Sequence, residues 1–152
     1  MDLENAYDKI YRYVYFRVKN RATAEDITQE TFLRLISQKG SIHSYEMKYL
    51  YTIARNLCID EYRRVKPESI SEEYEERVGE ADGELEDRIA VRQAVAELPL
   101  EDQEVLLLRY VNGESMGTIS KALGISRFAL YRRLKSAEDR LRISLEGCDY
   151  EK

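Results

Sequence analysis

Residues 45–64 combine aromatic, amide and cationic side chains at a spacing that suits contact with nucleic acid. One set of them recurs every three or four residues, which places it along one side of a helix. This set consists of Tyr45, Tyr49, Thr52, Asn56, Asp60 and Arg63. Tyrosine rings stack on unpaired bases, an asparagine amide hydrogen-bonds a base edge, and nearby arginines hold the backbone. The segment is therefore a candidate site for single-stranded nucleic acid, although tyrosines packed against a neighbouring helix are the commoner reason for such a pattern.

Residues 116–135 form a second candidate site, of a different kind. They fit a helix-turn-helix template, with Gly124 at the turn and Ser126 placed to cap the second helix. The apolar template positions are Ile119, Leu123, Ile125, Leu130 and Leu134. The second helix carries Arg127, Phe128, Tyr131, Arg132, Arg133 and Lys135. Such cation density is expected of a helix that lies in a major groove beside phosphates, so we predict binding to duplex DNA. The alternative is a helical hairpin with a solvated basic face.

Three amphipathic helices are predicted to position the first segment. The first spans residues 7–18, where apolar side chains recur at helical spacing. The second begins at Thr23, whose hydroxyl is expected to cap it with Asp26 in capping-box register, and ends at Gly40. The third covers residues 44–64. The expected inward residues are Tyr7, Ile10, Tyr11, Val14 and Val18, then Ile27, Phe32, Leu35 and Ile36, then Met47, Leu50, Ile53, Ala54, Leu57 and Cys58.

A second helical set is predicted to position the helix-turn-helix. Its first helix starts at Leu85 and is broken at Pro99, a residue that suits the opening turn of the next helix. That next helix covers residues 101–111 and is apolar on most sides, so its neighbours should enclose it. Asn112 and Gly113 supply a stop, because both tolerate the left-handed conformation. With little sign of strand alternation, the chain is predicted to be all-α, with two small helical domains of which the C-terminal one contains the helix-turn-helix.

The charge distribution separates the two domains. The chain has a net charge of −5, but residues 68–87 hold ten acids and one arginine, which amounts to −9 and leaves +4 elsewhere. This stretch also contains two glycines and few apolar residues, so it cannot bury enough surface to offset its chain entropy. We predict a first domain over residues 1–66, a flexible acidic linker over 67–84, a second domain over 85–147 and a tail over 148–152.

Composition disfavours several function classes. The chain is 43% hydrophobic and 35% charged, an ordinary balance for a folded cytosolic protein. It has neither a membrane-spanning apolar run nor the basic start of a secretion signal, so we expect a cytoplasmic protein without a membrane partner. Cys58 and Cys148 lie far apart and His43 is the only histidine, which argues against a metal site. Without a nucleophile–base pair or a phosphate-cradling glycine loop, we expect no enzyme and no cofactor.

Four blocks of the sequence resemble one family in the same order. They are residues 24–35, residues 49–60 with Arg63 and Arg64, residues 98–110 with Gly113, and residues 123–126 with Arg133 and Leu134. The chain thereby resembles the extracytoplasmic-function (ECF, group IV) sigma factors, promoter-specificity subunits of bacterial RNA polymerase. The resemblance implies a non-catalytic subunit that binds the clamp and flap of core polymerase, recognises −10 and −35 promoter elements, and initiates transcription. It also admits an anti-sigma factor as a partner.

The resemblance assigns roles to individual positions. The clamp-facing residues it implies are Asp26, Gln29, Glu30 and Leu33, the alternative for these acids being a solvated helix face. For recognition and melting of the −10 element it implies Tyr45, Tyr49, Asn56, Arg63 and Arg64. Asn56 matches an asparagine near the pocket for a base turned out of the −10 strand, and Tyr49 stands where tryptophan is usual. For −35 DNA it implies Ser126, Arg127, Tyr131, Arg132, Arg133 and Lys135, with Arg133 the closest match.

Several helix-turn-helix residues depart from the usual pattern of that family. Ser120 takes a position that is usually alanine, Gly117 and Thr118 replace acids, and Phe128 with Ala129 replaces a frequent Gly-Thr pair. These departures bear on the promoter sequence more than on the fold. Two other functions fit the residues: a free-standing helix-turn-helix regulator that acts without polymerase, and an interaction module that blocks polymerase without reading DNA.

Overall fold

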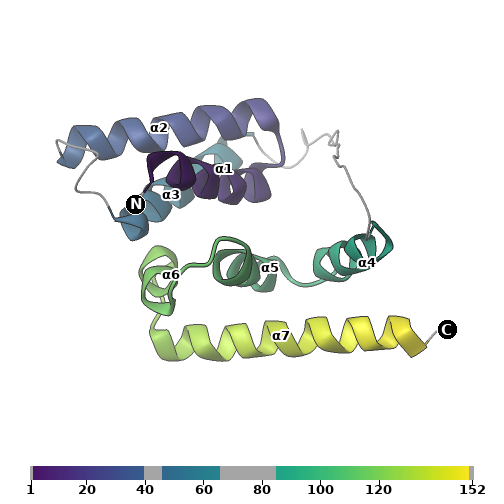
Figure 1. Cartoon of the computed structure of the whole chain (residues 1–152). Coiled ribbons are helices and arrows are strands. Elements are labelled where there is room, and N and C mark those ends of the chain that lie inside the picture. The colour runs from purple at the N-terminus through teal and green to yellow at the C-terminus, as the bar shows by residue number, and fades with distance from the viewer. Residues whose placement is uncertain (1, 40–45, 66–84, 151–152) are drawn as a thin grey trace. The chain divides into compact units, whose positions relative to one another are not determined.

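The computed structural model of the chain describes residues 2–39, 46–65 and 85–150. Every regular element in these ranges is a helix, and the chain divides into two compact units (Figure 1). The prediction of an all-α chain with two helical domains is therefore confirmed. The expected linker and Tyr45 lie outside the described residues. Within the described ranges, no helix combines the length and apolar character needed to cross a membrane.

The first unit is a bundle of α1 (Leu3–Val18), α2 (Arg21–Lys39) and α3 (Met47–Val65), each packed on the other two (Figure 1). Its core comprises Ala6, Ile10, Tyr13, Val14, Ala24, Ile27, Thr28, Thr31, Phe32, Leu35, Met47, Leu50, Tyr51, Ala54 and Cys58. At its centre the rings of Tyr13 and Tyr51, both 1% exposed, meet edge to face with centroids 5.6 Å apart. Such a pair contributes about 0.5–1.5 kcal/mol beyond the area it buries.

The start of α2 differs from the prediction. Lys19 ends α1 in the left-handed conformation, with φ at 56°, and Asn20 follows directly. The side-chain oxygen of Asn20 accepts the backbone N–H of Thr23 at 2.9 Å, so Asn20 caps α2. The prediction that Thr23 caps this helix with Asp26 as its partner was wrong, because an equally good cap stands three residues earlier. The predicted stop at Gly40 lies outside the described residues.

The buried face of α2 differs from the prediction in two ways. Thr28 and Thr31 are fully buried, and each hydroxyl donates at 2.7 Å to the carbonyl four residues before it, so neither hydroxyl is left unsatisfied in the core. Ile36, predicted to be buried, is 41% exposed. At 3.6 residues per turn, Ile36 lies beside the buried stripe and not on it. The apolar character of Ile36 does not by itself predict that the side chain is exposed.

The second unit contains α4 (Leu85–Ala96), α5 (Leu100–Leu106), the π-helical turn η3 (Leu107–Val111), most of α6 (Met116–Leu123) and α7 (Arg127–Tyr150). The long helix α7 packs against α4 and α5 (Figure 1). Its core comprises Ala94, Leu98, Val105, Leu106, Leu108, Ile119, Leu130, Leu134 and Ala137. α7 continues through Tyr150, so residues 148–150, which we assigned to a tail, are helical.

The helix predicted over residues 101–111 changes its character halfway. In η3 the N–H of Asn112 donates to the carbonyl of Leu107, five residues back, at 2.9 Å. The N–H of Glu114 then reaches the carbonyl of Leu108, and Gly113 adopts a φ of +70°. The stop at Asn112 and Gly113 is confirmed, whereas the widened turn before it has no signature in the hydrophobic pattern.

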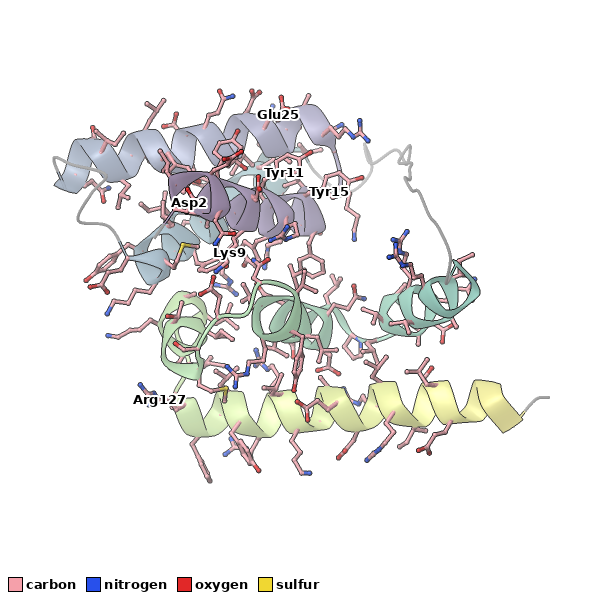
Figure 2. All side chains as sticks on the ribbon, viewed as in Figure 1. Asp2, Lys9, Tyr11, Tyr15, Glu25 and Arg127 are labelled. Carbon is pink, nitrogen blue, oxygen red and sulfur yellow. The ribbon has the colours of Figure 1, made fainter. Side chains whose placement is uncertain are left out.

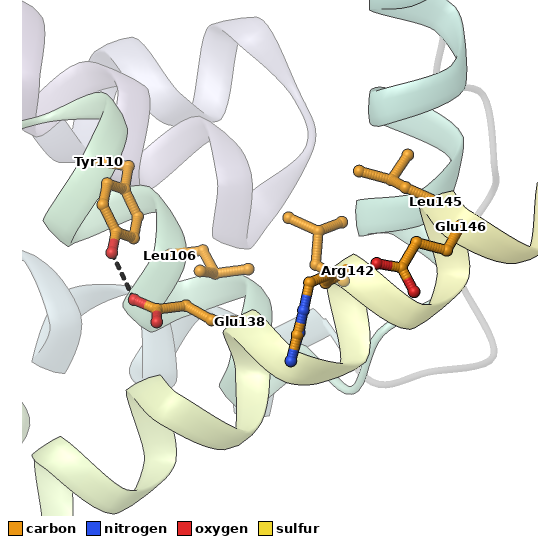
Figure 3. A pocket seen from close by; sticks show the side chains of 7 residues that line it. Leu106, Tyr110, Glu138, Arg142, Leu145 and Glu146 are labelled. Carbon is orange, nitrogen blue, oxygen red and sulfur yellow. Dashed lines mark hydrogen bonds between the residues drawn. The ribbon is translucent and has the colours of Figure 1, made fainter. Parts of the chain in front are cut away.

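A hollow of about 380 Å³ lies along α7 beside α5 and η3 (Figure 3). Its lining consists of Leu106, Tyr110, Glu138, Leu141, Arg142, Leu145 and Glu146. At its edge the hydroxyl of Tyr110 donates a hydrogen bond to the carboxylate of Glu138 (Figure 3). This bond holds the phenolic proton and raises the pKa of Tyr110 above its usual value. The contact ties η3 to α7 across 28 residues of chain.

A second polar contact joins the start of α5 to α7. The carboxylate of Asp102, whose side chain is 5% exposed, lies 2.6 Å from the guanidinium of Arg140. A buried carboxylate without its cation would keep the cost of leaving water and lose the attraction that offsets it. Arg140 is therefore expected to be important for the stability of this unit.

Replacing Arg140 with alanine should lower the free energy of unfolding by about 1–3 kcal/mol, since it leaves the buried Asp102 carboxylate unpaired. The measurement is urea denaturation of the full chain followed by circular dichroism, because the sequence has no tryptophan. Arg142→Ala on the same helix is the matched control: its pair with Asp139 is 2.8 Å long but exposed on both sides, and its loss should cost less than about 0.5 kcal/mol. Equal destabilisation by both variants would contradict the assignment.

Candidate nucleic-acid interface

The face of α3 opposite its buried stripe carries the predicted single-strand residues. Met47, Leu50, Ala54 and Cys58 point into the bundle. Tyr49, Thr52, Asn56, Asp60 and Arg63 are all exposed on the other side. The predicted exposure of this stripe is thus confirmed for its described members. Tyr49 is 40% exposed, with the Lys48 ammonium 5.5 Å from its ring centroid, so an aromatic surface and a cation lie together.

The C-terminal end of α3 is basic. Arg63 and Arg64 are both exposed in its last turn. The guanidinium of Arg64 lies 2.8 Å from the Glu61 carboxylate, and this hydrogen bond raises the pKa of Arg64. The pair is solvent-exposed on the arginine side, so it can be exchanged for another anion at little cost.

A polar face of α2 carries the four residues predicted to contact a partner protein. Asp26, Gln29 and Leu33 are exposed, and Glu30 is half-buried with its carboxylate 3.0 Å from Arg34. Their spacing places all four on one side of the helix, opposite the buried stripe. Leu33 is 61% exposed, an apolar side chain in the middle of a charged surface. A single exposed apolar residue is common on protein surfaces, so the role of this face in partner contact stays a prediction.

The helix-turn-helix geometry is built by three serines and a glycine. Ser115 accepts the N–H of Thr118 at 3.1 Å and Ser126 accepts that of Ala129 at 3.0 Å, so each serine caps its helix. Between the helices, Gly124 adopts a φ of +70°, where a Cβ would be strained. The hydroxyl of Ser120 donates to the carbonyl of Ile125 across the turn at 2.5 Å. The predicted capping by Ser126 and the turn at Gly124 are confirmed.

The structural role of Ser120 was missed from the sequence, where it stood out only as an unusual residue in place of alanine. A hydroxyl four residues before a turn glycine is ambiguous, since it can also bond back to its own helix. In the structure it closes the turn instead.

The first turns of α7 present a cationic and aromatic face. Leu130, Leu134 and Ala137 are buried on one side of the helix. The opposite side carries Phe128, Tyr131, Arg132 and Lys135, all exposed. Arg127 is also exposed, whereas Arg133 is half-buried at the margin of this face. Of the predicted duplex-contacting residues, Tyr131, Arg132 and Lys135 therefore share the face, and Arg127 and Arg133 flank it.

Arg127 lies at the junction of α6 and α7 (Figure 2). A Cβ built on Gly117 of α6 would come within 2.7 Å of a terminal nitrogen of the Arg127 guanidinium. The guanidinium thus lies against the bare backbone of α6. Gly117, which stands where the family usually has an acid, thus makes room for an arginine of the helix that follows.

Comparison with known families agrees with this geometry in both units. The sigma-70 region 2 family matches residues 3–67, and the sigma-70 region 4 family matches residues 88–141. These two matches contain the face of α3 and the helix-turn-helix, respectively. Together they define the class of the protein as a two-domain sigma factor of the sigma-70 type.

Individual relatives narrow the class. The ECF sigma factor SigL of Mycobacterium tuberculosis is 30% identical over 90% of this chain and 82% of its own length. SigW of Bacillus subtilis, also an ECF sigma factor, is 31% identical over 91% of this chain and 83% of its own length. The ECF sigma factor BldN of Streptomyces coelicolor is 34% identical over 81% of this chain, which spans 51% of that longer protein. This chain belongs to the ECF sigma factors.

A solved structure shares the fold. The sigma factor RpoE from Bartonella quintana, crystallised with the anti-sigma factor NepR, superposes with a TM-score of 0.71 at 19% identity. The match covers 95% of this chain and 94% of that one. At this identity the likeness concerns the fold alone.

Proposed function

We propose that this chain binds bacterial core RNA polymerase in the cytoplasm as a group IV sigma factor and directs it to promoters. The observation that supports the proposal is that each matched region contains one helix whose exposed side chains, opposite its buried stripe, are of types that suit contact with nucleic acid. In α3 these are aromatic and amide groups suited to unpaired bases, and in α7 they are cations suited to duplex DNA.

The face of α3 is proposed to hold the −10 element after its strands separate. Strand separation costs roughly 1.4 kcal/mol per stacked step on average. Capture of an unstacked base on an aromatic ring returns on the order of 1–3 kcal/mol. The capture of a few bases can therefore offset the free-energy cost of opening a short bubble. Tyr49 would stack and Asn56 would hydrogen-bond a base, while Arg63 and Arg64 would hold the backbone; Tyr45 is proposed for the same site from its sequence position alone.

The charged face of α2 is proposed as the contact with the polymerase clamp. Asp26, Gln29 and Glu30 would meet polar groups of the partner while Leu33 fills an apolar spot at the centre. The segment over residues 67–84 is proposed to act as the linker, with an acidic charge that suits a channel built for phosphates. An anti-sigma factor is a further proposed partner. No catalytic step is assigned to this chain, since the polymerase would carry out nucleotidyl transfer.

Reconstitution with bacterial core polymerase tests the proposal. We expect the full chain to co-purify with core enzyme and to support run-off transcription from a selected set of promoters. Tight binding to one duplex without any association with core enzyme would indicate a free-standing regulator. Association with core enzyme that only suppresses transcription would indicate a blocking module. Either result would overturn the proposal.

Asn56→Ala is expected to impair strand opening more than duplex binding, because the proposed amide contact exists only with an unpaired base. Permanganate footprinting measures opening, and a −35 duplex titration with the same holoenzyme measures duplex binding. Asn5→Ala is a matched control, since Asn5 is an exposed asparagine of α1, outside the proposed site. Equal losses in both assays would remove Asn56 from the −10 site.

Arg133→Ala is expected to weaken −35 duplex binding by about 1–3 kcal/mol, the range for loss of a base or close phosphate contact. Its half-buried position at the margin of the α7 face restricts the side chain, so that less freedom is lost on binding. Titration of the holoenzyme at fixed salt measures the effect, with Arg142→Ala farther along α7 as the control. An unchanged isotherm for Arg133→Ala would remove this residue from the interface.

A further inference from the structure

Phe128 is the most exposed large apolar side chain among the described residues, at 71% of its surface. Full burial of a phenylalanine is worth about 1.5–3 kcal/mol, so a ring this exposed forgoes much of that stabilisation. The ring lies in the first turn of α7, directly after the helix-turn-helix turn. It shares its face with Tyr131, Arg132 and Lys135, opposite the buried Leu130 and Leu134. Residues at the start of such a helix reach base edges in the major groove.

The surroundings of the ring indicate what it meets. Residues 127–135 contain four cations and no acid, in a chain of net charge −5, so this face selects a polyanion. The Arg132 guanidinium lies 4.9 Å from the Phe128 ring centroid, which holds the ring and the cation together. An apolar ring within a cationic face suits a site where phosphates surround one apolar group.

The major groove offers such a group. Among the base edges it displays, the 5-methyl group of thymine is the apolar one, and phenylalanine is a side chain that contacts it. We infer that Phe128 reads the 5-methyl group of a thymine in the −35 element, with Arg132 stacked on the ring and directed to an adjacent phosphate or base. This inference rests on the function proposed above. It makes Phe128 a residue that determines promoter choice.

Replacement of single thymines by uracil in the −35 duplex removes only the methyl group and so isolates this contact. With the full chain in holoenzyme, on a −35 element selected by the reconstitution above, we expect one substitution to lower affinity by about fourfold. That figure corresponds to the loss of one buried methyl-sized group. The same duplex should bind Phe128→Ala holoenzyme with no difference between thymine and uracil. Phe128→Leu should keep part of the difference.

Ile143→Ala provides the matched control, because Ile143 is a 64% exposed apolar residue farther along α7. That variant should retain the full response to uracil. Circular dichroism of each variant checks folding, which replacement of so exposed a ring should not disturb. Specific −35 binding that responds to no uracil substitution, or responds equally in wild type and Phe128→Ala, would overturn the inference and leave the sigma function intact. Absence of any specific duplex binding by the holoenzyme would instead overturn the function itself.

Discussion

The opposition between a buried stripe and an exposed stripe on the same helix is the constraint on which both units depend. Side chains spaced by three and four residues share one side of a helix, so burial of one set forces the set half a turn away into solvent. In α3, packing of Leu50 and Ala54 turns Asn56 outward. In α7, packing of Leu130 and Leu134 turns Phe128 and its neighbours outward in the same way. The core therefore orients the binding surface.

This constraint explains why much of the architecture could be predicted from the sequence. The spacing of apolar residues predicts where a helix forms and which of its faces is buried. The turn at Gly124 is predictable because glycine is the residue that most readily adopts a positive φ. The residue at which a helix starts was harder to predict from the sequence. Both Asn20 and Thr23 are acceptable caps, and only the point at which α1 ends decides between them. The widened turn of η3 depends on which carbonyl each N–H reaches, a choice that apolar spacing does not record.

In both units, the exposure of some residues follows from their spacing in the sequence, whereas that of others depends on how the helices pack. The spacing of residues was enough to place Tyr49 and Asn56 on an exposed face. It also suggested that Ile36 would be buried. That prediction was wrong, because Ile36 lies at the edge of the buried stripe of α2. Tyr51 was absent from the expected core, although it packs edge to face on Tyr13 at its centre. An amphipathic side chain such as tyrosine fits either side, so its position follows from its neighbours.

Gly117 bears on how much side-chain conformational entropy Arg127 loses when a ligand binds the helix-turn-helix. An arginine side chain carries about 2 kcal/mol of rotamer freedom, most of which a ligand must normally suppress. Here the Arg127 guanidinium lies against the backbone at Gly117 before any ligand arrives, in a place where a Cβ on residue 117 would come within 2.7 Å of it. A side chain already restrained in this way has less motion left to lose. The lack of a Cβ at Gly117 in α6 thus leaves room for the Arg127 guanidinium of α7 to be positioned before binding.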